Sequence, residues 1–168
     1  MASPNIVQGD QVVTGQLVAQ GGFVPPAGSI GDAAIAAAAG ISASKLQHEH
    51  RKAHAQESAT TVADEARVLH TVRGAAGTIK SFVAGAVVPA VGDAIVEIDL
   101  LKDGVSVLDA AIEVNVAHAA YEVVAGTIDT PTVAAGDVLE VSIDGTIGTG
   151  TLAKGVFCEL SVREDAET

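Results

Sequence analysis

The stretch that decides the fold is "DAIVEIDLLKDGVSVLDAAIEV", residues 93–114. Its first half alternates two kinds of side chain, with Ala94, Val96, Ile98 and Leu100 on one face and Glu97 and Asp99 on the other. Alternation with a period of two residues is typical of a half-buried antiparallel strand. Asp103-Gly104 then separates two apolar runs, which is the strongest short signal for a hairpin. The stretch therefore predicts two antiparallel strands joined by a tight turn.

The same alternation recurs toward the C-terminus, in "DVLEVSID" (137–144) and "GVFCELSVR" (155–163). Glycines at the ends of the apolar runs are spaced as turns would be. Counting all such runs gives about seven or eight strands in roughly 100 residues, a density typical of sandwiches and jelly rolls. We expect a mainly β chain in which residues 67–168 form an antiparallel β-sandwich or jelly roll.

Residues 1–44 have a different composition, rich in Gly, Pro and Ala, and their only charged side chains are those of Asp10 and Asp32. Asp32 is a suitable N-cap for a short helix through "AAIAAAA", and Gly40 would end that helix. So short a helix is marginal in isolation because nucleation is costly. We interpret residues 1–44 as an extended, uncharged N-terminal docking arm.

Residues 45–66 predict a short helix followed by an extended connector. Ser42 is a plausible N-cap, and Lys45, Leu46, Gln47 and Glu49 are compatible with a helix. Leu46 has no large apolar partner at helical spacing, so the predicted helix is short.

The arm can be ordered only if something compensates its lost entropy. Fixing about thirty residues costs on the order of 30 to 60 kcal/mol of backbone entropy. At roughly 25 cal/mol per Å² of apolar area, offsetting that cost needs about 1,200 Å² or more. Neighbouring subunits could offer such an area, whereas the alternative is a disordered tail. The residues we expect in a capsid or subunit interface are Ile6, Val12, Leu17, Phe23, Ile35, Leu46, His48 and His50.

The charge and composition argue against several classes of partner. Nine basic and 21 acidic side chains give a formal net charge of -12, which repels nucleic-acid phosphates. Aromatic residues make up 2% of the chain, so platforms for stacking bases or sugars are scarce. No signal peptide and no long apolar run is recognisable, so we expect no membrane partner.

Three histidines form an H-x-H-x3-H cluster: His48, His50 and His54. On a helix, His50 and His54 would share a face at a spacing known for zinc. Arg51 and Lys52 lie inside the cluster and raise the local positive potential, so we predict no metal site. Hydrogen bonding at a subunit contact is the favoured role. An ion held by symmetry-related histidines on a threefold axis stays open.

The sequence offers no convincing catalytic group. His70 is in phase with Val68 and Val72, and we expect both His70 and His118 to be structural histidines with hydrogen-bond partners. Cys158 alternates with apolar residues and predicts a buried thiol. The carboxylates fall on outward strand faces, where they keep a sheet soluble. We therefore predict neither an enzyme nor a cofactor.

Two segments resemble small virion proteins of tailed bacteriophages, namely the head decoration, cement and head-fibre proteins. The first runs from "GISASKLQHEHRKAHAQESATT" into the hairpin stretch, and the second is "VAAGDVLEVSIDGTIGTGTLAKGVFCELSV" (133–162), with a "GD-x-L-x-V" strand, a Gly/Thr loop and a closing strand. Together they span about residues 40–163. The resemblance implies a trimeric β-sandwich that sits on a capsid lattice.

These observations predict a non-enzymatic virion protein on the outer capsid surface, made in the host cytoplasm. It would bind the major capsid protein across capsomers as a homotrimer, with linked arms giving avidity. The alternative is a glycan-binding module of a tail fibre or spike, although scarce aromatics disfavour it.

Overall fold

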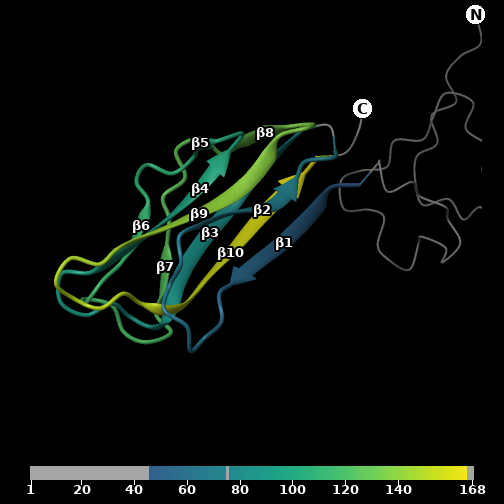
Figure 1. Ribbon diagram of the computed structural model, residues 1–168. Helices are drawn as coiled ribbons and strands as arrows, with labels where there is room; N and C mark the ends of the chain where they lie inside the picture. The colour runs from purple at the N-terminus through teal and green to yellow at the C-terminus, as the bar shows by residue number, and fades with distance from the viewer. Residues whose placement is uncertain (1–45, 75, 166–168) are drawn as a thin grey trace, which may run out of the picture. The chain divides into compact units, whose positions relative to one another are not determined.

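The computed structural model describes residues 46–74 and 76–165, which form two antiparallel sheets (Figure 1). We call this part of the chain the two-sheet domain. Its strands are β1 (His48–Ala55), β2 (Glu65–Thr71), β3 (Ala76–Val88), β4 (Ile95–Lys102), β5 (Val105–Ser106), β6 (Ile112–Val114), β7 (Val123–Ala125), β8 (Thr132–Ala134), β9 (Val138–Thr146) and β10 (Lys154–Glu164). No helix occurs among the described residues. The prediction of a mainly β, antiparallel fold is confirmed.

Each sheet has five strands, and the edge strands β1 and β2 lie next to each other on one side of the domain. The first has the order β1-β10-β3-β7, with β8 also on β3, and the second has the order β2-β9-β4-β5, with β6 also on β4. Within the described residues, β1 and β2 each pair on one side only, and the two strands lie against each other. The edges of both sheets therefore meet along this side.

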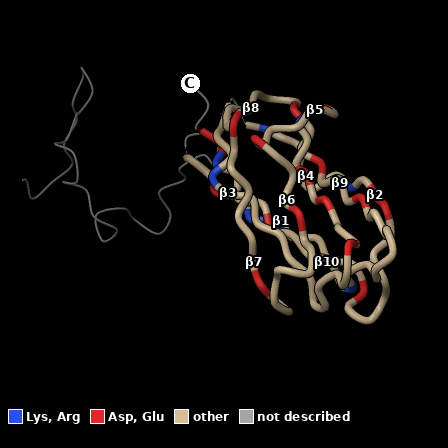
Figure 2. The backbone as a smooth tube through the Cα atoms, turned by 90° about the vertical axis from the view of Figure 1, so that its left-hand side faces the viewer, with Lys and Arg blue, Asp and Glu red and all other residues tan. Residues whose placement is uncertain are grey.

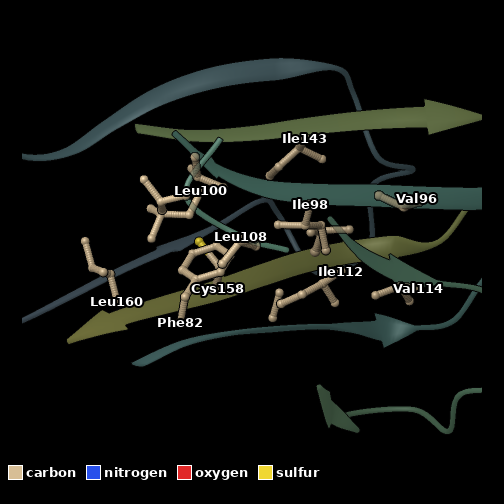
Figure 3. Packing of buried hydrophobic residues seen from close by; sticks show 14 of the residues in the cluster. Phe82, Val96, Ile98, Leu100, Leu108, Ile112, Val114, Ile143, Cys158 and Leu160 are labelled. Atoms are coloured by element: carbon tan, nitrogen blue, oxygen red, sulfur yellow. The ribbon is translucent and has the colours of Figure 1, made fainter. Parts of the chain in front are cut away.

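A single apolar core lies between the sheets (Figure 3). Phe82 from β3 and Leu160 from β10 belong to the first sheet, Ile98 and Leu100 from β4 belong to the second, and all four are fully buried. The predicted inward faces are confirmed, because each of these residues is at most 1% exposed: Ala94, Val96, Ile98, Leu100, Leu139, Val141 and Ile143. Cys158 is buried in the same core, as its alternation predicted.

The predicted hairpin turn joins β4 to β5. Asp103 and Gly104 have φ angles of 50° and 81°, and a two-residue turn of this kind needs positive φ at both central positions. Lys102 pairs with Val105 across the turn. The dipeptide thus allows the chain to reverse without splaying the two strands.

The helix predicted within residues 45–66 is wrong in the described part of that range. Residues His48–Ala55 form β1, which pairs along its whole length with β10. The inward positions of β1 carry His48, His50, Lys52 and His54, so the strand has an alternation of burial without an alternation of hydrophobicity. Residues that we assigned to a helix and connector therefore supply an edge strand to the first sheet. The arm at residues 1–44, with its predicted helix, lies outside the described residues.

Two smaller differences concern strand boundaries. The apolar run at residues 105–114 is divided between β5 and β6, and β8 was not predicted. A register shift in β2 places Val68 opposite Glu140 and His70 opposite Leu139, which leaves Leu69 as an extra residue. Such a bulge changes which side chains face inward. Val68 is therefore exposed while Val72 is buried, although strict alternation put both on one face.

Acidic residues outnumber basic ones in the chain, and they are spread over the strands and loops of the two-sheet domain (Figure 2). On the second sheet, Glu97 lies opposite Glu113 on β6 and opposite Asp144 on β9. Like charges directly opposite each other are unfavourable between strands. They stay there because the outward face is solvated and the inward face already drives pairing. The described residues include no helix with the length and apolarity needed to span a bilayer.

Replacing Leu100 with alanine should lower the free energy of unfolding by about 2–5 kcal/mol, because it opens a cavity between the sheets. Val105→Ala is the control, since Val105 is 69% exposed and should cost less than about 1 kcal/mol. Urea denaturation of the full chain measures both. Equal losses in the two variants would contradict the assigned core.

Candidate functional site

A groove of about 660 Å³ opens where the two edge strands meet. Its walls come from β1, β2, the Arg73-Gly74 turn and the end of β10. Leu46, His48 and His50 line it, together with His70 and Glu164. Three segments far apart in the sequence thus converge on one surface depression.

Glu164 is the centre of this groove's hydrogen bonding. Its carboxylate is only 7% exposed, although it sits near the open side. Oε1 lies 2.6 Å from Nε2 of His70, and Oε2 accepts a hydrogen bond of 2.5 Å from the backbone N–H of Gly74. The N–H of Arg73 lies 3.3 Å from Oε2. The buried carboxylate therefore has partners on both oxygens, which a buried charge requires.

These contacts keep Glu164 ionised. Burial by itself raises the pKa of the carboxyl, but the hydrogen bond with His70, the bonds from Gly74 and Arg73 and the charge of His70 together outweigh it. The pKa of Glu164 consequently lies below its ordinary value. The groove thus holds a permanent carboxylate at neutral pH.

Two more imidazoles stand beside this pair. Nε2 of His50 is 3.8 Å from Oε1 of Glu164, and the rings of His50 and His70 have centroids 5.0 Å apart. The ring of His48 stacks on that of His50 with centroids 6.1 Å apart. Alternation along β1 points both side chains to the same face, so the strand presents a row of imidazoles to the groove.

His54, the third member of the H-x-H-x3-H cluster, has a different partner. Its Nε2 lies 2.7 Å from Oε1 of Glu65 on β2, which also accepts a hydrogen bond from Gln56. The hydrogen bond with His54 is the main reason why the pKa of Glu65 falls to about 2, and the bonds from Gln56 and Arg67 add to it against the effect of burial. The two sheets are thus joined by two separate histidine–carboxylate contacts, His54–Glu65 between β1 and β2 and His70–Glu164 between β10 and β2.

Comparison with protein-family models, curated proteins and solved structures found no match.

The predicted interface residues divide into two groups. Leu46, His48 and His50 all line the groove. The other five lie outside the described residues: Ile6, Val12, Leu17, Phe23 and Ile35. Their role as an interface stays a prediction.

Sequence reasoning treated His70 only as a structural histidine and missed Glu164. His70 does have the hydrogen-bond partner expected of such a residue, and His118 likewise contacts Asn115. A signal for Glu164 was present, because it continues the inward phase of Leu160 and Val162. An acidic residue on an inward face must find a partner, and this rule could have marked it as part of a buried cluster.

The groove offers imidazole and carboxylate groups, whereas the only cysteine of the chain does not line it. Cys158 lies in the core, where burial raises its pKa to about 11. A thiol in that state is protonated at neutral pH and is not a nucleophile. The chemistry available in the groove is therefore hydrogen bonding, proton exchange and cation binding by histidine and glutamate.

Replacing Glu164 with alanine should cost about 3 kcal/mol of unfolding free energy, because it leaves His70 and two backbone N–H groups without their acceptor. Glu164→Gln keeps an oxygen for those donors and should cost less. Glu97→Ala, on the exposed face of β4, is the matched control and should change stability by under about 0.5 kcal/mol. Urea denaturation at pH 7 measures all three, and a harmless E164A substitution would contradict the structural role.

The Glu65 carboxylate predicts a defined pH dependence. Its pKa is lowered to about 2 in the folded chain, so its stabilising contribution is complete above the ordinary pKa and is lost as the pH falls toward 2. The difference in unfolding free energy between the natural chain and Glu65→Gln should shrink as the pH falls from about 5 toward 2. Urea denaturation at a series of pH values measures this difference. A difference that does not vary with pH would contradict the assigned contact.

Proposed function

We propose that this chain is a structural protein of a tailed-bacteriophage virion that decorates and stabilises the capsid. In this proposal it binds the major capsid protein across neighbouring capsomers as a homotrimer, on the outer surface of the particle. The two-sheet domain is the jelly-roll module of such a protein, and residues 1–44 are its docking arm. The chain acts by binding and not by catalysis.

The observation that carries the proposal is the position of the groove on the two-sheet domain. Residue 46, where the described part of the chain begins, lines the same groove as the two other described residues that the sequence nominated for an interface, His48 and His50. Exposed apolar side chains flank it, since Leu46 is 46% and Val68 59% exposed. Unpaired edge strands and exposed apolar groups favour contact with another chain. The groove is thus a suitable place for a contact with another subunit.

The distribution of charge supports the same proposal. The arm has two charged side chains, whereas the whole chain has a net charge of -12, so nearly all of that charge belongs to the rest of the chain. An acidic surface favours solubility and opposes association through the outward sheet faces. An uncharged segment is free of that repulsion and can be buried between subunits. This division suits a protein that binds by one end and exposes the other.

The capsid proposal is tested by co-sedimentation with shells assembled from the major capsid protein of the same genome. Leu17→Asp combined with Phe23→Asp places charge in the arm and should lower binding at least tenfold, because about 1.4 kcal/mol of lost burial is a tenfold change. Val105→Asp, at an exposed position of the two-sheet domain, is the matched control and should bind as the natural chain does.

Sedimentation velocity of the free protein should give three times the mass of the 16.7 kDa chain. Full binding by the doubly substituted arm would overturn the docking role, and a monomer would overturn the trimer. Binding to a glycan array with no binding to shells would favour the tail-fibre function.

A further inference from the structure

We propose that His50, His70 and Glu164 of one chain bind a single divalent transition-metal ion of the zinc class. Each residue offers one ligand atom, and these atoms all lie within 4.8 Å of one another. The site was not evident in the sequence, because its residues lie on β1, β2 and β10. It also differs from the H-x-H-x3-H cluster, whose third histidine contacts Glu65 instead.

The distances suit a metal after small side-chain movements. Ligand atoms around a tetrahedral zinc ion are roughly 3.3 Å apart, given bonds of about 2.0–2.2 Å. The contact between His70 and Glu164 is 2.6 Å and must open, whereas that between His50 and Glu164 is 3.8 Å and must close slightly. His50 is the freest to move, since its side chain is 35% exposed on an edge strand. We expect rotation of its ring to bring the third ligand into place.

The carboxylate is already positioned as a ligand. The backbone N–H groups of Gly74 and Arg73 contact Oε2, while Oε1 faces both imidazoles. Hydrogen bonds to a ligating carboxylate fix its orientation and strengthen metal binding. Little reorganisation is therefore needed at this residue.

The donor set selects the kind of ion. Two imidazole nitrogens and one carboxylate oxygen suit zinc, cobalt and nickel, whereas calcium and magnesium prefer an all-oxygen shell. Three protein ligands leave a fourth position, which water can reach from the open groove. Lys52 and Arg73 also line the groove, alongside Asp165, so the local field is mixed. The affinity for the metal must therefore come from direct bonds to the three ligands and not from a negative electrostatic potential around the site.

A bound ion would link the two sheets. His50 and Glu164 belong to the first sheet and His70 to the second, so the metal would join them at the side where their edges meet. A ligand that binds only the folded state raises its stability. This inference concerns one chain alone and does not depend on capsid binding, so either proposal can fail without the other.

The experiment is isothermal titration of Zn²⁺ into the full chain after treatment with a chelator. We expect one ion per chain with a dissociation constant tighter than about 100 µM. His50→Gln should weaken binding by about tenfold or more, because it removes a ligand. His118→Gln removes a histidine that contacts Asn115 outside the groove, and it should bind zinc as the natural chain does.

Thermal unfolding gives a second readout. Zinc should raise the melting temperature of the natural chain and of H118Q by several degrees and that of H50Q much less. Melting of H50Q without metal shows that this variant folds. Absence of zinc binding, unchanged binding by H50Q, or a stoichiometry of one ion per three chains would overturn the intrachain site. The last result would indicate an ion between subunits.

Discussion

The whole structure depends on burying two apolar sheet faces against each other. Neither sheet has a helix to cover it among the described residues, so each face must be covered by the other. With only Phe82 as a large aromatic at the centre, the core is filled mainly by Val, Leu, Ile and Ala (Figure 3). Such side chains fit the pleated surface of a strand closely. The outward faces carry exposed acidic residues such as Glu97, Glu113 and Asp144.

The same constraint explains the polar cluster at the open side. β10 runs beyond the end of the apolar core, and its inward phase brings Glu164 to the place where the next apolar residue would lie. A buried carboxylate is costly unless it is paired and hydrogen-bonded. His70 from the opposite sheet and the turn at Arg73 and Gly74 supply those partners. The contact between the sheets thus changes from apolar in the centre to ionic at the edge.

The two proposals use the same groove for different purposes. The proposed capsid decoration would use the exposed apolar side chains of the groove, Leu46 and Val68, together with the residues before 46. Metal binding needs only the three ligands on its floor. A metal that joined β1 to β2 would also make the groove more rigid, and a more rigid surface loses less entropy when a partner binds. The two proposed functions are therefore compatible, although each depends on different residues of the groove.

The sequence by itself determined the strand class, the inward residues of β4, β9 and β10, and the turn at Asp103 and Gly104, because alternation and turn chemistry are properties of short segments. It could not reveal β1, since His48 and its neighbours carry no hydrophobic alternation and become a strand only through pairing with β10. It could not unite His50, His70 and Glu164, which are adjacent only because the edges of two sheets meet and a bulge at Leu69 interrupts the alternation along β2. The pairing of β1 and the meeting of these three residues are fixed by tertiary structure, because sheet order and register depend on contacts between distant segments.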